Sequence, residues 1–350
     1  MFAVRLAIRQ AQGAAPCMVS MSNHHDEVHA ANYNKAIMPQ NEIDFIPHTP
    51  AVLKQIFSRR GITPSKRFGQ NFLIDQNILL CIPDIADLKE DDVILEIGTG
   101  TGGLTRLLAS GSRHVFTVEL DKKLFELSSD ILKFYTNITL VNTDILKTKH
   151  ELNPDIISLV LNWLKEHNQP RIKVVSNLPY NISTPVIINL LEGDLPIDLM
   201  VMMLQKEITE RMTAIPGTRE YGILSVITQL FSEVAVVKTL PPEVFWPRPE
   251  VHSSLVKIVV HKEKYADRIT DYPFFRKIIY AIFTSRRKML INSLENLNLP
   301  KISRENLKGI MKDMQLDERI RGECLGVDQL IYLSDAIVSL KTSLMKIPEK

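Results

Sequence analysis

The stretch Val93-Ile-Leu-Glu-Ile-Gly-Thr-Gly-Thr-Gly-Gly-Leu-Thr105 leads from a short apolar run into a loop rich in glycine. The apolar run, residues 93–97, predicts a buried strand, and the residues from Leu104 to Ser110 predict the helix behind it. Glycine lets the backbone turn tightly at this junction and approach a ligand without a Cβ in the way. A strand, a glycine loop and a helix in this order indicate an α/β unit that binds a ligand at the loop.

Predicted strands and helices continue to alternate after this unit. Short apolar runs predict four more strands, separated by helix-length segments, over His114–Glu119, Ile138–Val141, Ile172–Ser176 and Ile197–Leu204. Strands joined in this way form a parallel sheet with helices on both faces, so we expect a Rossmann-like α/β fold. Two predicted helices, one from Thr49 to Gly61 and one from about Asp75, precede the sheet.

The last third of the chain differs from the α/β region. It becomes rich in predicted strands after Glu233, and it is helical from about Tyr272 onward. We therefore predict a flexible extension over residues 1–46, the Rossmann-like domain over 47–265 and a small all-helical domain over 266–350. Residues 1–25 contain no acid but carry Arg5 and Arg9, which fits either an organelle transit peptide or a start codon placed too early. The His24-His25-Asp26-Glu27-Val28-His29 cluster lies on this extension, and we predict no metal site there.

The overall composition is that of a soluble globular protein. Of 350 residues, 45% are hydrophobic and 23% are charged, which excludes wholesale disorder and gives enough apolar residues for a sizeable core. The sequence has no run of about 18 apolar residues, so we expect no membrane span. Three well-separated cysteines without a CxxC pair fit a reducing compartment, and Cys81 follows an apolar run and is expected in the core.

The distribution of charge is uneven although 42 basic and 40 acidic residues nearly cancel. The stretch from Phe45 to Ile74 has five basic residues and no acid, and the stretch from Tyr272 to Leu294 repeats this pattern with Arg286, Arg287 and Lys288 among its bases. Acid-free basic stretches in a near-neutral chain indicate contact with a polyanion, although a pair of solvated faces gives the same pattern.

Two acids follow the predicted strands at positions that suit a nucleoside. Glu119 ends the strand after the glycine loop, where an acid accepts hydrogen bonds from both hydroxyls of a ribose. Asp144 lies just past the third strand, where it can accept from the N6 amine of a bound adenine or cap a helix. The glycines at 98, 100 and 103 also satisfy the dinucleotide pattern, so these residues alone leave open a nicotinamide cofactor or S-adenosylmethionine.

The sequence Asn177-Leu178-Pro179-Tyr180 after the fourth strand favours the second cofactor. A proline two residues past a buried strand cannot donate a ladder hydrogen bond, so the segment leaves the sheet and is rigid. The amide oxygen of Asn177 and the carbonyl of Leu178 can then accept from the exocyclic amine of a base, while Tyr180 offers a face for stacking. Acceptors aimed at that amine direct its nitrogen lone pair toward an incoming methyl group.

Six stretches together resemble the bacterial small-subunit ribosomal RNA adenine dimethyltransferases, the kasugamycin-sensitivity family. The resemblance runs from about residue 49 to about residue 340, and the stretches are residues 65–73, 96–105, 177–185, 204–207, 245–253 and 283–294. It departs from the family's pattern in the first forty-odd residues and in a longer segment from about Glu151 to Arg171. The fold that it implies is a Rossmann-like, S-adenosylmethionine-dependent methyltransferase sheet followed by small C-terminal helices.

The resemblance also implies roles for individual residues. Residues that line the cofactor site are Asn71, Leu73, Gly98, Glu119, Asp144 and Asn177. The catalytic motif is Asn177-Leu178-Pro179-Tyr180, and Phe245 is expected to pack against the flipped-out base opposite Tyr180. Arg286, Arg287 and Lys288 are expected to contact RNA phosphates. No metal is implied.

The implied substrate is a pair of adjacent adenosines near the 3′ end of 16S ribosomal RNA in the small subunit, each methylated twice by a cytoplasmic, monomeric enzyme. Large-subunit (23S) ribosomal RNA methyltransferases of the macrolide-resistance type share the glycine loop and the Asn-Leu-Pro-Tyr motif, and are the second hypothesis. A non-catalytic ribosome assembly factor, a mitochondrial relative that doubles as a transcription factor and a nicotinamide dehydrogenase are weaker hypotheses. The last of these gives no reason for Asn177-Leu178-Pro179-Tyr180.

Overall fold

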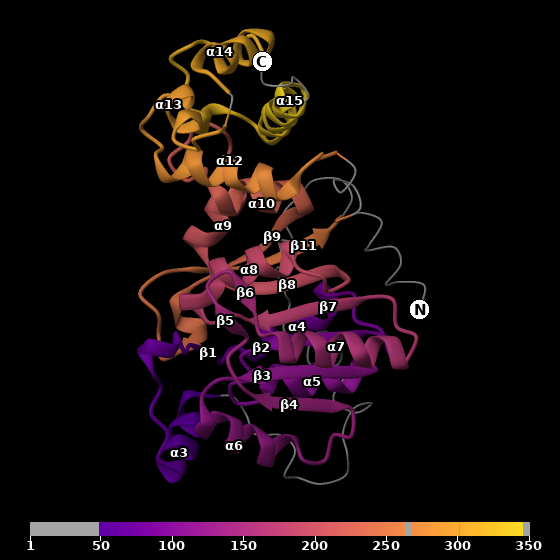
Figure 1. Cartoon of the computed structure of the whole chain (residues 1–350). Helices are drawn as coiled ribbons and strands as arrows, with labels where there is room; N and C mark the ends of the chain where they lie inside the picture. Colours follow the sequence, from indigo (N-terminus) through magenta and orange to yellow (C-terminus); the bar gives the residue numbers. More distant parts are fainter. Residues whose placement is uncertain (1–48, 263–267, 301, 346–350) are drawn as a thin grey trace, which may run out of the picture. The chain divides into compact units, whose positions relative to one another are not determined.

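The computed structural model describes residues 49–262, 268–300 and 302–345. A seven-stranded sheet with the order β4-β3-β2-β7-β8-β11-β9 lies at its centre (Figure 1). The strands are β2 (Val93–Ile97), β3 (His114–Glu119), β4 (Ile138–Asn142), β7 (Ile172–Asn177), β8 (Ile197–Gln205), β9 (Ser232–Leu240) and β11 (Ser253–Val260). The five predicted α/β strands are thus confirmed to within one residue at each end.

The sheet is parallel in one part and antiparallel in the other. The five strands from β4 to β8 run parallel, whereas β11 pairs antiparallel with both β8 and β9. The difference follows from the connections, because only residues 241–252 join β9 to β11 and they contain no crossover helix. The region predicted to be rich in strands therefore forms the antiparallel edge of the same sheet.

Helices cover both faces of the sheet. In β2, Leu95 points into a core cluster shared with α7 (Pro154–Glu166), α8 (Ser183–Glu192) and α10 (Ile223–Phe231). The next residue toward the start of that strand, Ile94, packs on the other face against α4 (Gln76–Ile85) and α5 (Gly103–Gly111). Alternating side chains that are both fully buried are the mark of a strand covered on two faces. The segment from Glu151 to Arg171, which departs from the family's pattern, contains the short strand β6 (Glu151–Leu152) and α7.

A third cluster joins the start of the described chain to the sheet. Helix α3 (Pro50–Arg60) begins after Thr49, whose hydroxyl accepts from the amide of Val52, and it ends at Gly61 with φ of 59°. Its Leu53 and Phe57 pack against α6 (Lys122–Leu132). The chain then passes through the short helix η1 (Lys66–Phe68) to β1 (Phe72–Leu73), which pairs with β10 (Phe245–Trp246). The predicted helices before the sheet are confirmed.

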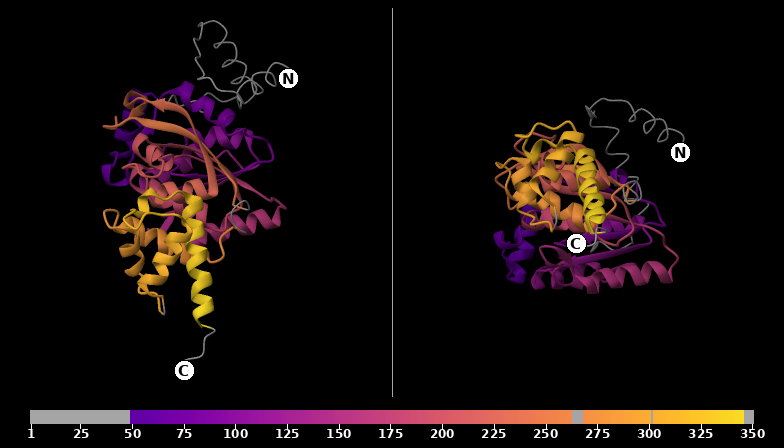
Figure 2. Two further views of the ribbon diagram at one scale, coloured as in Figure 1. Left: turned by 90° about the horizontal axis from the view of Figure 1, so that it is seen from above. Right: turned by 45° about the horizontal axis from the view of Figure 1, so that its top comes forward.

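The C-terminal helices are α12 (Tyr272–Thr284), α13 (Leu290–Glu295), α14 (Arg304–Asp313) and α15 (Val327–Met345), drawn from orange to yellow in Figure 2. Their apolar side chains belong to the same cluster as one face of the sheet. Polar contacts add to this packing, because the Tyr272 hydroxyl donates to Glu192 at 2.5 Å and the Tyr221 hydroxyl donates to the Leu325 carbonyl at 3.1 Å. The predicted boundary at 265/266 falls within residues 263–267, outside the described part, as does the predicted extension over 1–46.

One expectation about the core is wrong. Cys81 is exposed on α4, because the buried side of this helix carries Ile78 and Ile82 at a spacing of four residues. The apolar run before Cys81 indicated a helix correctly but did not indicate its orientation. Among the described residues, no helix is long and apolar enough to cross a membrane.

Candidate active site

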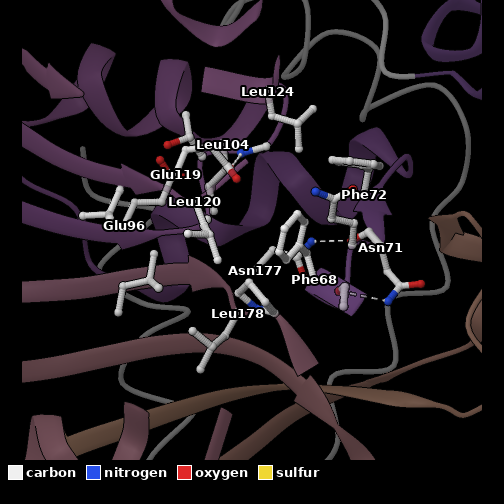
Figure 3. Close-up of a pocket in the computed structure, with 18 of the residues that line it drawn as sticks. Phe68, Asn71, Phe72, Glu96, Leu104, Glu119, Leu120, Leu124, Asn177 and Leu178 are labelled. Carbon is white, nitrogen blue, oxygen red and sulfur yellow. Dashed lines mark hydrogen bonds between the residues drawn. The ribbon is translucent and has the colours of Figure 1, made fainter. Parts of the chain in front are cut away.

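A cavity opens at the carboxyl ends of the parallel strands, and residues 68–73 form part of its lining (Figure 3). Parallel α/β sheets bind ligands at this edge, where the strand order leaves a crevice. The structure brings to the lining all the residues predicted for the cofactor and the motif: Asn71, Leu73, Gly98, Glu119, Asp144, Asn177, Leu178, Pro179 and Tyr180.

The residues predicted for the cofactor and the target amine stand in a row that follows the strand order. Asp144, Glu119, Gly98 and Asn177 lie at the ends of β4, β3, β2 and β7 or within two residues of them, and these strands are adjacent in that order. Neighbouring strands lie about 4.8 Å apart, so the row from the first to the last of these strands spans about 14 Å. A row of this length suits an extended ligand whose successive groups each meet one strand end.

The glycine loop has the backbone that its sequence requires. Gly98 has φ of 88°, Gly100 of 56° and Gly102 of 74°, which is the left-handed region that favours glycine. The loop also lies against the motif, because a Cβ at Gly98 would stand 3.2 Å from Cγ of Pro179. Any side chain at Gly98 would therefore displace both the loop and the proline.

Glu119 is held by backbone donors on both of its carboxylate oxygens. Oε2 accepts from the amide of Gly100 at 2.8 Å, and Oε1 accepts from the amide of Asp121 at 2.9 Å. The residue is 6% exposed, and burial raises the pKa of its carboxyl group, against the lowering effect of these hydrogen bonds. The backbone amide of Leu120 also stabilises this carboxylate, and the lone pairs that remain can accept from a ligand in the cavity.

Asp144 does not cap a helix. Its Oδ1 accepts from the amide of Leu146 at 2.9 Å in a local turn, and the cap of α7 is Asn153. The helix-cap alternative for Asp144 is therefore wrong, and the residue lines the cavity next to Ile145.

Asn177 has a fixed amide orientation. Its Nδ2 donates to the backbone carbonyl of Asn71 at 2.8 Å, which turns Oδ1 to the opposite side of the amide group (Figure 3). Tyr180 follows in the short helix η2 (Tyr180–Ile182), and its hydroxyl lies 2.5 Å from Oγ of Ser253 on β11. Burial raises the pKa of this phenol, so it stays protonated at neutral pH. The motif thus presents one acceptor and one aromatic ring, both held in place by neighbouring elements.

Comparison with known proteins decides the family. The model of the family described as ribosomal RNA adenine dimethylase matches residues 62–331. The chain belongs to the ribosomal RNA adenine dimethylase family. A protein of Halothermothrix orenii named "Ribosomal RNA small subunit methyltransferase A" is 39% identical to it over 297 residues, which are 84% of this chain and 95% of that protein.

Two solved structures show the same fold as this family member. One is a dimethyladenosine transferase from Plasmodium falciparum, with a TM-score of 0.62 and 24% identity over 77% of this chain and 98% of that one. The other is the 23S ribosomal RNA methyltransferase ErmE, with a TM-score of 0.52 and 22% identity over 77% of this chain and 100% of that one. The fold is therefore a Rossmann-like methyltransferase sheet with C-terminal helices.

Two residues predicted to bind the substrate of this family lie elsewhere. Phe245 is 2% exposed, pairs with Leu73 between β10 and β1, and is not among the residues that line the cavity. Its ring therefore offers no accessible face to a base. Arg286 has partners within the protein: its guanidinium contacts Glu323 at 2.8 Å and donates to the carbonyls of Thr218 and Arg219. By contrast, Arg287 and Lys288 are exposed, as the prediction of phosphate contacts requires.

Several apolar residues of the cavity were not predicted from the sequence, among them Phe68, Phe72, Leu120 and Ile145. Leu120 is the clearest, because it is 46% exposed directly after a buried acid. The sequence signal that could have indicated Leu120 and Ile145 is their position, because each directly follows one of the two acids predicted to contact the nucleoside. Among the described residues, no group of three or more His, Cys, Asp and Glu side chains could hold a metal ion.

Glu96 lies beneath the glycine loop and is 1% exposed. Its Oε2 accepts from the hydroxyls of Thr105 at 2.6 Å and Thr117 at 2.7 Å, which joins β2 to α5 and β3. Burial raises the pKa of this carboxyl group from 4.5 to about 8, and the hydrogen bonds from the two threonines only partly oppose that rise. Glu96 is therefore mostly protonated at neutral pH.

The raised pKa of Glu96 makes the stability of the protein depend on pH. The unfolded chain loses this proton near pH 4.5 and the folded chain near pH 8, so the free energy of unfolding falls as pH rises through this window. Glu96→Gln keeps an acceptor for the threonines and removes the titration. From about pH 5 to about pH 8 we expect the variant to gain up to about 4 kcal/mol relative to the wild type, at about 1.36 kcal/mol per pKa unit. Urea unfolding of both proteins measures this, and a pH-independent difference would contradict the assignment.

Proposed function

We propose that the protein transfers methyl groups from S-adenosylmethionine to N6 of two adjacent adenosines near the 3′ end of 16S ribosomal RNA, forming N6,N6-dimethyladenosine. The observation that carries the proposal is the position of Asn177, whose oriented amide ends the row of polar residues along the strand ends. The similarity to a protein named as a small-subunit methyltransferase supports the choice of RNA.

The cavity suits S-adenosylmethionine group by group. The carboxylate of Glu119 can accept from the ribose hydroxyls, and Asp144 stands one strand further along for the adenine amine. The exposed Leu120 offers apolar surface to one face of that adenine. Gly98, Gly100 and Gly102 carry no side chain and take φ values that favour glycine, so the backbone at these positions can contact the amino-acid part.

The target adenine occupies the end of the row at β7. Asn177 Oδ1 and the carbonyl of Leu178 accept from the two N–H groups of N6, and the ring of Tyr180 stacks on the base. N6 is buried in a paired helix, so the base must be unpaired or flipped, at a cost of a few kcal/mol. Stacking on one aromatic ring returns about 1–3 kcal/mol of this. The hydrogen bond from Tyr180 to Ser253 holds the ring for that contact.

Catalysis consists of positioning. The bound cofactor supplies an activated methyl group on a sulfonium. The protein aims the nitrogen lone pair of N6 at that methyl group by accepting its hydrogens, and it excludes water with Phe68 and Phe72 above the cavity. The methylated N6 loses one proton after the first transfer and keeps one hydrogen for the second, so one acceptor contact remains while the added methyl group occupies the place of the other.

Arg287 and Lys288 contact phosphates of the RNA, whereas Arg286 stabilises the fold. Arg286→Ala removes the 2.8 Å contact to Glu323 and leaves only Arg321, at 3.9 Å, beside that carboxylate, so we expect it to lower the free energy of unfolding by about 1–3 kcal/mol. Arg287→Ala should change stability by less than about 0.5 kcal/mol, because the side chain is exposed. It should weaken subunit binding and reduce the slope of log affinity against log salt by about one. Thermal unfolding and binding at three salt concentrations test this, and an unchanged slope for Arg287→Ala would rule out its phosphate contact.

The protein acts as a cytoplasmic monomer on the small subunit. The 23S alternative rests on the shared glycine loop and Asn-Leu-Pro-Tyr motif, and the structural likeness at 22% identity adds evidence for the fold only. Purified protein, tritiated S-adenosylmethionine and unmodified small or large subunits distinguish the two substrates. Label in small-subunit RNA supports the proposal, and label only in large-subunit RNA supports the alternative. Small-subunit binding without any label would favour the assembly-factor role.

A further inference from the structure

The segment from Ser65 to Leu73, here named the strap, contributes residues 68–73 to the cavity lining and is held by side-chain hydrogen bonds. Gln70 makes two of them, because its Nε2 donates to Oδ2 of Asp121 at 3.0 Å and its Oε1 accepts from the amide of Ser65 at 2.7 Å. The next residue, Asn71, is the one whose carbonyl accepts from Asn177. The amide that holds the strap is thus adjacent in sequence to the carbonyl that orients the motif.

Asp121 is a rigid anchor for Gln70. Its Oδ1 caps α6 by accepting from the amides of Lys123 at 2.9 Å and Leu124 at 3.4 Å, which leaves Oδ2 for Gln70. The backbone amide of Asp121 donates to Oε1 of Glu119. A continuous chain of hydrogen bonds and backbone therefore runs from the carboxylate of Glu119 through Asp121 and Gln70 to the carbonyl that holds Asn177.

We infer that Gln70 is a positioning residue for methyl transfer: by fixing the strap to Asp121, it holds the carbonyl of Asn71 in the place that orients the amide of Asn177. This inference rests on the proposed function, because it takes Asn177 as the group that meets the target amine.

The effect of Gln70 on methyl transfer can be measured separately from its effect on binding of the cofactor. Beyond Asn71 the strap has its own attachment, because β1 pairs with β10 and the amide of Ile74 donates to the carbonyl of Val244 at 2.8 Å. Loss of the contact between Gln70 and Asp121 therefore loosens the strap around Asn71 while β1 stays in place. Methyl transfer at saturating cofactor should then fall more than the affinity for the cofactor.

The two side chains allow an exchange of donor and acceptor. In Gln70→Glu the new carboxylate still accepts from Ser65, but it faces the carboxylate of Asp121 without a donor between them. In Asp121→Asn the helix cap is kept, but the new amide nitrogen at position 121 faces the amide nitrogen of Gln70, donor against donor. In the double variant the new amide at position 121 donates to the new carboxylate at position 70, so the hydrogen bond returns with its direction reversed.

The test is the single-turnover rate of methyl transfer from saturating S-adenosylmethionine to unmodified small subunits, with the cofactor dissociation constant and the melting temperature measured on the same proteins. We expect Gln70→Glu to lower the rate about tenfold, as for the loss of one charge-assisted hydrogen bond. Asp121→Asn should lower it severalfold, and the double variant should recover to within about twofold of the wild type. The control Gln55→Glu makes the same change on the exposed side of α3 and should keep the wild-type rate.

Three results would overturn the inference. They are a wild-type rate for Gln70→Glu, a double variant at least as slow as the slower single variant, or a loss confined to cofactor affinity. Failure of the proposed function gives a different result, because the wild type itself would then transfer no methyl group to small subunits.

Discussion

Asn177→Ala is expected to lower the rate of methyl transfer by about 10²–10³-fold, as for removal of one preorganised polar contact to the reacting group. The substitution removes the acceptor that directs the lone pair of N6, and it also removes the donor to the carbonyl of Asn71. The side chain is only partly buried at the cavity wall, so the fold should tolerate its loss. Single-turnover methylation of unmodified small subunits at saturating cofactor measures the effect.

The matched control for Asn177→Ala is Asn162→Ala, the same change on the exposed side of α7. It should leave the rate within about twofold of the wild type, since exposed substitutions away from special features have small effects. If Asn177→Ala stayed fully folded and methylated within about threefold of the wild type, Asn177 could not be the group that orients the target amine.

Glu119→Gln is expected to weaken binding of S-adenosylmethionine about 100-fold. The carboxylate can accept from two ribose hydroxyls, and a hydrogen bond to a charged group contributes about 1.5–3 kcal/mol. A glutamine has the same shape, but its amide nitrogen must face the backbone amide of either Gly100 or Asp121, donor against donor. Isothermal titration with the cofactor alone measures the effect without RNA.

Glu126→Gln provides the control for Glu119→Gln, because Glu126 is exposed on α6 and loses the same charge. It should bind the cofactor as the wild type does. Equal affinity in Glu119→Gln and the wild type would mean that Glu119 supports only the glycine loop and does not contact the ribose.

The architecture was predicted well from the sequence where an apolar run and a following glycine loop both indicate the same element. The run from Val93 to Ile97, buried on both faces, and the glycine loop after it could only be a parallel strand and its ligand-binding turn. The antiparallel edge was harder to predict, because the apolar residues of β9 and β11 indicate strands without indicating their direction. Only the short link between them, without a crossover helix, carries the difference in direction.

The candidate site was predictable in part, because strand order brings residues at strand ends together. Glu119, Asp144 and Asn177 each follow a predicted strand, so their common location follows from the fold. Phe245 and Arg286 were harder, since nothing in the sequence distinguishes an aromatic ring that faces a base from one packed between β1 and β10. In the same way, an arginine in a basic run can still pair with a distant acid, here Glu323, that only the tertiary structure brings near.

The anchoring of the strap could not be predicted from sequence. Gln70 and Asp121 are 51 residues apart, and neither position has a pattern that indicates a contact between them. The resemblance gives roles to Asn71 and Leu73, which follow Gln70, yet the contact that fixes the strap depends on the cap of α6.

The most direct test of the central claim is mass spectrometry of nucleosides from the RNA of small subunits that lack the modification, after incubation with the protein and S-adenosylmethionine. We expect two molecules of N6,N6-dimethyladenosine per RNA with the wild type, and none after a short incubation of the same duration with the Asn177→Ala protein. Methylated adenosine found only in large-subunit RNA, or no methylated adenosine in either RNA although the cofactor binds, would contradict the account.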